Sequence, residues 1–256
     1  MSTSRKPTAI LIVHGGYFLP TSWANFIEDL SQAGFTVRCP RLPTCGDERP
    51  PKAQLEDDVA AVRKEAFELV EMGHTILVLA HSYGGVVATQ AIASDLYAGT
   101  SSDRGGVVSL VYLSAWLIQP HDSVVSVIEK YGLQSDVDLG NNNDGTVFAK
   151  NAPVSFYNDI EPAQAEALAK MNVTHNWMAA SGTVMLAPWK DLPTVYIHCL
   201  QDRAIKLPLQ QHMVEDITAL RSSSLETKTV DSGHCPFLSK PQQLLRTIEE
   251  IIASIE

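Results

Sequence analysis

The chain is poor in basic residues. Its 256 residues include 19 Lys and Arg against 29 Asp and Glu, so its formal net charge is −10. Nucleic acids and anionic membrane surfaces are bound through basic patches, and a chain with this balance repels them. We therefore expect no nucleic-acid partner and no membrane partner.

Cysteine is also scarce. The four cysteines, Cys39, Cys45, Cys199 and Cys235, have no C-x-x-C spacing, and they are too few for a disulfide framework in a chain of this length. The sequence contains no H-E-x-x-H motif and no Cys/His cluster with ligand spacing, so it predicts no metal site. We expect free thiols in a reducing compartment.

Long hydrophobic runs are missing as well. The first apolar run, Ala9 to Val13, is far shorter than the ~18 residues of a spanning helix, and no cleavage-site flank accompanies it. The last residues, Ser254 to Glu256, match no retention or peroxisomal signal. These absences lead us to expect a cytoplasmic protein.

What the chain does have is material for a core. Hydrophobic residues make up 45% of it, and its length fits one large domain or a core with an insertion. Short β-branched apolar runs alternate with amphipathic stretches of helical spacing, which is typical of parallel βαβ units. The runs cover residues 9–13, 36–39, 75–80, 107–113, 194–200 and 225–230. The pattern predicts a doubly wound α/β domain with a mostly parallel six-stranded sheet.

This alternation stops once, between Trp116 and Trp189, where helical patterns recur without a convincing buried strand. We read this stretch as an insertion. Residues 1–115 and 190–256 are therefore predicted to form the core, and residues 116–189 a helical cap inserted in it.

The most informative segment is the predicted strand that ends in Ala80-His-Ser-Tyr-Gly84 and opens directly into a helix. A serine on so sharp a strand-to-helix turn has a strained backbone, so the residues two before and two after it must be small. Ala80 and Gly84 meet this requirement. The turn exposes the Ser82 hydroxyl and directs helix N-terminal amides toward negative charge that forms beside it. The segment predicts Ser82 as a nucleophile rather than a structural serine in a glycine-rich turn.

A serine hydroxyl needs a base, and the base needs a carboxylate that orients it. Of eight histidines, His234 lies in a turn-rich loop after the last predicted strand, at the sheet edge where ligands bind. His14 and His81 each adjoin a strand end and are expected to be structural neighbours of the site. Asp202, directly after a predicted strand, is the predicted third member. Asp231, three residues before His234, is the rival and is expected to serve a turn.

Acyl transfer also needs two amides that stabilise an oxyanion. We predict the Tyr83 amide and the Gly16 amide, the latter from the loop Val13-His-Gly-Gly-Tyr-Phe18, with Tyr17 as the alternative. The same loop lacks the third glycine of a dinucleotide fingerprint and the lysine of a P-loop. No cofactor is expected.

Aromatic side chains near the predicted site favour an apolar pocket. The aromatic residues are Tyr17, Phe18 and Trp116 at strand ends and Phe148, Phe156 and Trp177 in the predicted cap, and Met178 of the cap is predicted to line the pocket with them. The alternative is that the cap aromatics form a small core of their own.

The strand-turn-helix around Ser82 has the form of a nucleophile elbow. Together with the His14-Gly15-Gly16 loop and the chain order Ser82, Asp202, His234, this elbow resembles the α/β-hydrolase superfamily from about residue 8 to the end. Within this superfamily, the chain is similar to the single-domain branch that contains plant-type methylesterases, hydroxynitrile lyases and their microbial and fungal relatives. The resemblance implies that Ser82 attacks an ester or lactone carbonyl and that water resolves the acyl-enzyme. Hydroxynitrile lyases place a lysine after the catalytic histidine, whereas this chain has Cys235.

The expected function is that of a serine esterase or lactonase for a small apolar substrate, without a cofactor or metal. Two alternatives stay open. One is a C–C bond hydrolase or lyase on the same triad, and the other is a small-molecule receptor with residual hydrolase activity. The presence of all three catalytic elements favours catalysis. The sequence makes no prediction of oligomeric state.

Overall fold

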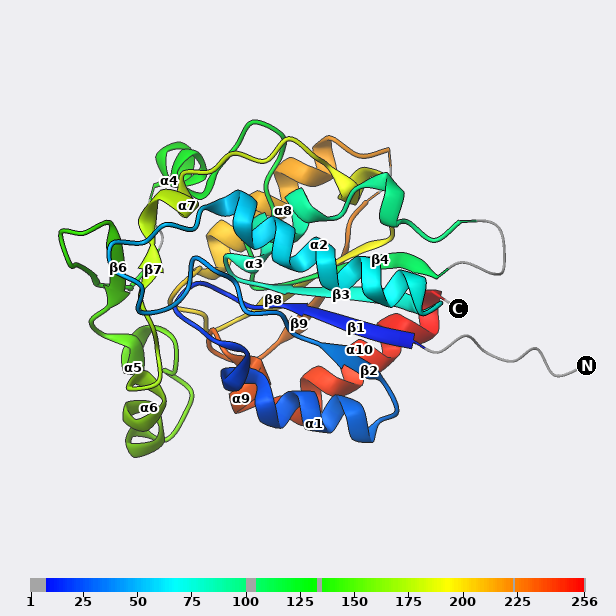
Figure 1. The fold of residues 1–256 in the computed structure, drawn as a ribbon. Helices are drawn as coiled ribbons and strands as arrows, with labels where there is room; N and C mark the ends of the chain where they lie inside the picture. Colours follow the sequence, from blue (N-terminus) through cyan, green and yellow to red (C-terminus); the bar gives the residue numbers. More distant parts are fainter. Residues whose placement is uncertain (1–7, 100–104, 133–134, 223, 256) are drawn as a thin grey trace, which may run out of the picture.

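A wholly parallel sheet lies at the centre of the computed structural model, which describes residues 8–99, 105–132, 135–222 and 224–255 (Figure 1). Its six strands have the order β2-β1-β3-β4-β8-β9, and each neighbouring pair is parallel. The strands are β1 (Thr8–Val13), β2 (Thr36–Arg38), β3 (Thr75–His81), β4 (Gly106–Leu113), β8 (Thr194–Cys199) and β9 (Glu226–Val230). The predicted α/β architecture is confirmed.

The central strands are buried on both faces, which explains their unbroken apolar sequences. In β1, Ala9, Leu11 and Val13 pack into the hydrophobic cluster on one side of the sheet, and Ile10 and Ile12 into the cluster on the other. All five side chains are inaccessible to solvent.

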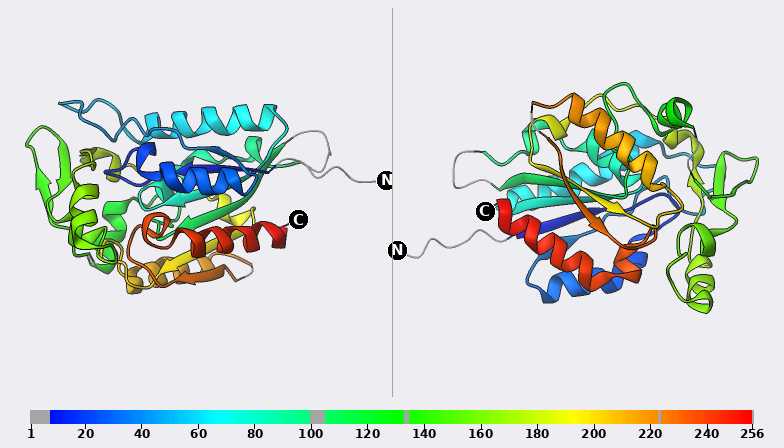
Figure 2. Two further views of the ribbon diagram at one scale, coloured as in Figure 1. Left: turned by 90° about the horizontal axis from the view of Figure 1, so that it is seen from below. Right: turned by 180° about the vertical axis from the view of Figure 1, so that it is seen from behind.

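Helices cover the two faces (Figure 2). One face carries α2 (Leu55–Glu71), α3 (Gly84–Ala91) and α8 (Leu207–Ala219). The other carries α1 (Ala24–Gln32), α9 (Pro236–Ser239) and α10 (Pro241–Ile255). Short 3-10 helices occupy Pro20–Trp23, Ser94–Leu96 and Pro188–Lys190.

Residues 116–132 and 135–180 lie beyond the carboxyl ends of the central strands, and residues 181–189 lead back toward the start of β8 (Figure 1). They contain α4 (Val124–Tyr131), α5 (Ala152–Ser155), α6 (Pro162–Ala169) and α7 (Trp177–Ala180). They also contain an antiparallel sheet of β5 (Leu139–Asn141), β6 (Thr146–Ala149) and β7 (His175–Asn176). The expectation of helices alone missed this sheet, because strands of two to four residues are too short to show a period. The division into a core and a separate cap stays a prediction.

No helix among the described residues is long and apolar enough to span a bilayer. The four cysteines are free thiols, and Cys45, Cys199 and Cys235 are buried.

Candidate active site

Ser82 occupies the turn between β3 and α3 with a left-handed backbone conformation, at a φ of 53°. Such a φ is strained for a residue with a side chain and is found mainly at functional sites. The turn presses against the end of β1, because a Cβ added to Gly84 would lie 2.1 Å from the Val13 carbonyl oxygen. Backbone amides of Gly85 and Trp116 donate to the Ser82 carbonyl oxygen at 3.0 and 3.1 Å. Two further segments therefore hold the strained turn in place.

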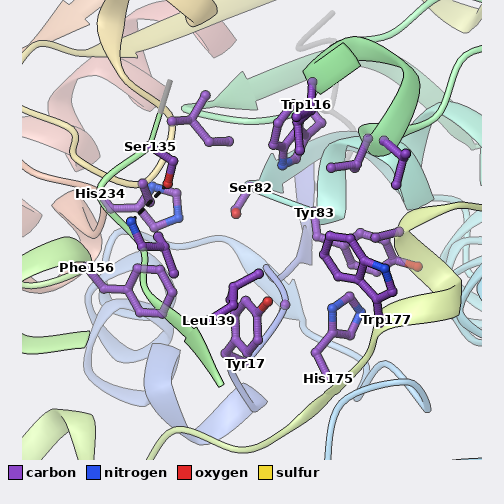
Figure 3. A pocket seen from close by; sticks show the side chains of 18 of the residues that line it. Tyr17, Ser82, Tyr83, Trp116, Ser135, Leu139, Phe156, His175, Trp177 and His234 are labelled. Carbon is purple, nitrogen blue, oxygen red and sulfur yellow. Dashed lines mark hydrogen bonds between the residues drawn. The ribbon is translucent and has the colours of Figure 1, made fainter. Parts of the chain in front are cut away.

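His234 and Asp202 form a buried pair. The distance from His234 Nδ1 to Asp202 Oδ2 is 2.7 Å, and the side chains are 1% and 0% exposed. A carboxylate oxygen accepts, so Nδ1 carries the proton and Nε2 is left as the basic nitrogen. His234 and Ser82 line the same cavity (Figure 3).

Four donors surround the Asp202 carboxylate. Oδ1 accepts from the backbone amides of Ala204 at 2.6 Å and Ile205 at 3.0 Å. Oδ2 accepts from His234 Nδ1 and from the Ser114 hydroxyl. Hydrogen bonds of this number fix the orientation of the carboxylate.

The rival carboxylate lies elsewhere. Asp231 is exposed, and its Oδ1 accepts from Gln201 Nε2 at 2.7 Å. The structure brings Asp202, and not Asp231, to the histidine.

Ser114 is a residue that sequence reasoning missed. It follows β4, is fully buried and has a φ of 38°, and its amide donates to the Ile197 carbonyl oxygen at 2.9 Å. A serine after a strand carries no distinctive sequence pattern. Only the pairing of β4 with β8 brings its hydroxyl to Asp202.

Two histidines support the site from beneath. His81 Nε2 lies 2.9 Å from the His234 carbonyl oxygen, and burial lowers the pKa of His81 well below its ordinary value. His14 Nδ1 donates to the Gly15 carbonyl oxygen at 2.9 Å, while Nε2 accepts from the Leu42 amide at 3.1 Å. Burial lowers the pKa of His14 to about 4, so the imidazole is neutral. Both histidines lie where structural neighbours were expected.

The two predicted oxyanion residues, Gly16 and Tyr83, both line the cavity beside Ser82. The loop of Gly16 approaches the elbow closely. A Cβ on Gly15 would lie 2.8 Å from Ser82 Cβ, so this position requires glycine. The arrangement makes both amides available to an oxyanion, and their role stays a prediction.

Beneath Tyr83 lies a buried carboxylate that the sequence analysis did not identify. The Tyr83 hydroxyl donates to Asp58 Oδ2 at 2.9 Å, and Thr44 donates through its amide at 3.0 Å and its hydroxyl at 2.6 Å. Burial raises the pKa of Asp58 to about 6. A clue was present, since Asp58 falls three residues after Leu55, on the apolar face of α2.

The cavity has a volume of about 240 Å³ and mostly apolar walls. Of the aromatic residues predicted to line it, four do so, namely Tyr17, Trp116, Phe156 and Trp177 (Figure 3). The lining residues that were not predicted include Val124, Val125, Ile128, Val137, Leu139, His175, Ala180, Ala204 and Ile205. Most of them come from residues 116–189, whose course the sequence pattern does not predict.

The prediction that Phe18, Phe148 and Met178 line the cavity is wrong. Phe18 is 1% exposed and packs into the hydrophobic cluster on the α1 and α10 side of the sheet, with its ring 5.8 Å from that of His81. Phe148 covers Gly140 across the small sheet, where a Cβ would lie 2.2 Å from its ring. Met178 is 61% exposed because the turn of α7 directs it to solvent. A helix or strand aims adjacent side chains in different directions, so position alone did not place them.

The site contains no grouping suited to a metal. Among residues 8–99, 105–132, 135–222 and 224–255, no cluster of three or more His, Cys, Asp or Glu side chains could hold an ion. The site instead places Ser82, with its strained backbone, in one cavity with His234, whose imidazole is held by the buried Asp202 carboxylate.

Comparison with known proteins gives consistent results. Residues 10–247 match the model of the "Alpha/beta hydrolase family". The chain is 28% identical over 251 residues to "Probable hydrolase R7" of Phoma sp., with 94% of this chain and 97% of that protein covered. It is 26% identical over 269 residues to "Methylesterase 7" of Arabidopsis thaliana, with 94% and 95% covered.

Among solved structures, a mutant of polyneuridine aldehyde esterase superposes with a TM-score of 0.75 at 18% identity, covering 96% of this chain and 99% of that one. At this identity the likeness concerns the fold. The family match extends over nearly the whole chain and confirms the resemblance drawn from the elbow and the loops. This chain belongs to the alpha/beta hydrolase family.

Proposed function

We propose that the protein is a carboxylic-ester hydrolase that works through an acyl-enzyme on Ser82. The observation that carries the proposal is that His234, bound to Asp202 by a 2.7 Å hydrogen bond, lines one cavity with a serine held at a φ of 53°. The printed names of the relatives, a probable hydrolase and a methylesterase, support the same class.

In the proposed reaction, His234 Nε2 takes the proton of the Ser82 hydroxyl as its oxygen attacks the ester carbonyl. The amides of Gly16 and Tyr83 stabilise the oxyanion, and each such donor is worth about 2.7–4 kcal/mol in comparable sites. Protonated His234 then gives its proton to the departing alcohol. Water, activated by the same imidazole, releases the acid and restores Ser82. A lactone follows the same steps, with acid and alcohol joined in one product.

The cavity wall favours a neutral substrate. Among the residues that the structure describes, the lining includes no Lys or Arg, and its one acidic side chain, Glu129, is exposed. An apolar wall without a cation offers no opposite charge to a substrate carboxylate. The acid product is therefore bound more weakly than the ester, which assists its release.

The experiment that tests this function compares the wild type with Ser82→Ala. Hydrolysis of short-chain and aryl p-nitrophenyl esters and of lactones is measured, together with intact-mass labelling by a fluorophosphonate. Ser135→Ala is the matched control, because Ser135 also lines the cavity but its hydroxyl is engaged with the Val137 amide at 3.1 Å. We expect turnover and one adduct in the wild type and the control, and neither in Ser82→Ala. A folded wild type that gives neither would contradict the proposal.

A further inference from the structure

Two polar side chains in the apolar cavity have no hydrogen-bond partner within the described part of the chain. They are the Tyr17 hydroxyl and the His175 imidazole, and both line the cavity. They lie on the same side of it, near Ser82 (Figure 3). Buried polar groups are normally paired, so a pair left free in a cavity wall indicates a ligand.

The two groups lie next to each other and next to the predicted oxyanion loop. Their rings are 5.6 Å apart in an edge-on arrangement. A Cβ on Gly16 would lie 3.0 Å from His175 Nδ1, and the Tyr83 ring is 4.5 Å from the His175 ring. A group bound between Tyr17 and His175 therefore belongs to the same molecule whose carbonyl reaches Ser82.

The fold holds both side chains firmly. Tyr17 has a φ of 70°, a strained value for tyrosine, and its carbonyl oxygen accepts from the Val173 amide at 2.9 Å. His175 is 3% exposed and belongs to β7, which pairs with β6. Strain of this kind persists where the surroundings impose it, most often at ligand sites.

Both groups are uncharged at neutral pH. Burial and, to a smaller extent, the nearby His14 lower the pKa of His175 to about 3, while burial raises the pKa of Tyr17 well above its ordinary value. The ring nitrogen Nε2 of His175 is sealed from solvent and has no partner. A proton there would leave a buried N–H unsatisfied, which is costlier than a bare acceptor, so the proton belongs on Nδ1.

We propose that Tyr17 and His175 form a two-donor site for an acceptor oxygen of the substrate, beside the oxyanion loop. The Tyr17 O–H and the His175 Nδ1–H both donate to it. The substrate class is then a neutral, mostly apolar ester that carries a second uncharged oxygen, such as a keto group, near the reacting carbonyl. This inference rests on the proposed esterase function and specifies its substrate.

The test measures kcat/KM for methyl hexanoate and for its oxo derivatives with the keto group at successive chain carbons. We expect the wild type to prefer at least one oxo ester by about 10- to 100-fold, since each hydrogen bond to an uncharged oxygen contributes roughly a factor of 2 to 13. Tyr17→Phe and His175→Leu should each reduce this oxo-to-plain ratio several-fold. His175→Asn, which keeps a donor, should restore part of it.

Tyr83→Phe is the matched control. It also removes a tyrosine hydroxyl from a residue of the cavity wall, but that hydroxyl is already bound to Asp58. It should change the rates for oxo and plain esters by the same factor. A wild-type ratio near one for all oxo positions, or a ratio that Tyr17→Phe and His175→Leu leave intact, would overturn the donor site.

A binding measurement separates this inference from the esterase proposal. The same esters are titrated into Ser82→Ala, with the fluorescence of Trp116 and Trp177 in the cavity wall as the readout. If the wild type hydrolyses no ester, the esterase proposal fails. Tighter binding of the oxo ester to Ser82→Ala, lost on adding Tyr17→Phe, would still support the donor site, and equal binding of both esters would refute it.

Discussion

The Ser114 hydroxyl donates to the same carboxylate oxygen of Asp202 that accepts from His234. Three strand ends meet at this point, because Ser114 follows β4, Asp202 follows β8 and His234 follows β9. The carboxyl edge of a parallel sheet is where such residues converge. Ser114 thus orients the carboxylate that orients the base.

We expect Ser114→Ala to lower kcat/KM for esters about tenfold and stability by about 1–3 kcal/mol, because a buried carboxylate loses one of its donors. Steady-state kinetics and urea unfolding measure the two effects. Ser109→Ala, on the same strand and bound only to the Pro193 carbonyl oxygen, is the control and should leave kcat/KM intact. Equal effects from both variants would argue against a positioning role.

Asp58 should make stability depend on pH. Burial raises its pKa in the folded chain to about 6, from 3.8, so the folded state holds a proton that the unfolded state releases. The stabilising contribution is full below about pH 4 and is lost as pH rises through 6, by a free energy on the order of 3 kcal/mol. Asp58→Asn should remove this difference when urea unfolding is followed from pH 4 to pH 7.

Glu56→Gln, an exposed neighbour on the same helix, is the control for that series. It should leave the pH dependence of unfolding as in the wild type. If Asp58→Asn retains the wild-type pH dependence, the carboxyl is ionised in the fold throughout the range.

Gly84→Ala should prevent the elbow from forming. The added Cβ would lie 2.1 Å from the Val13 carbonyl oxygen and 2.6 Å from that of His14. Both are backbone atoms, which cannot move aside as a flexible side chain could. We expect a loss of stability above about 3 kcal/mol and loss of fluorophosphonate labelling. Gly34→Ala is the comparison: its φ is +97°, but nothing lies within 4 Å of an added Cβ, so it should cost only about 1 kcal/mol of backbone strain. A stable, labelled Gly84→Ala protein would contradict this account.

Esters that carry a free carboxylate should be hydrolysed slowly. We expect the monomethyl ester of a dicarboxylic acid to have a kcat/KM at least about 100-fold below that of a neutral methyl ester of equal length, because the cavity wall has no cation. Ile128→Lys places an ammonium group on the wall and should narrow the difference. Glu129→Lys, at the exposed rim, should change it far less. Comparable rates for the two esters in the wild type would refute the expectation.

The thiols should play no part in catalysis. Burial raises the pKa of Cys45 to about 12 and that of Cys235 well above its ordinary value, and thiols react as thiolates. The native protein should keep the proposed esterase activity in iodoacetamide at pH 8, and mass spectrometry should find these two cysteines unlabelled until the chain is unfolded. Inactivation with an adduct on Cys235 would point to a different nucleophile.

Local patterns in the sequence were sufficient for the parallel sheet and for the strand-turn-helix around Ser82. Burial on both faces leaves continuous apolar runs, and an elbow needs small residues at fixed offsets. Both features can therefore be predicted from short stretches of sequence. The positions of Asp202 and His234 followed from the rule that loops at the carboxyl edge carry ligands.

Other features depended on contacts between distant segments. The strands of residues 116–189 are too short to produce a period, and the direction of Phe148 or Met178 depends on how those strands and turns pack. Ser114 and His175 are ordinary residue types in ordinary local settings. The position of Asp58 on the apolar face of α2 indicates burial, but only tertiary packing brings its carboxylate to the Tyr83 hydroxyl.

The sequence by itself therefore determined the sheet, its strand ends and the strand-turn-helix around Ser82, since hydrophobic periodicity and turn sterics act over a few residues. The tertiary structure decided which side chains meet at those ends. Ser114 reaches Asp202 only because β4 pairs with β8, and Tyr17 meets His175 only because β7 folds back over the loop after β1. Hydrogen bonds and cavities arise from such long-range contacts, and the free energy of packing the whole chain selects them.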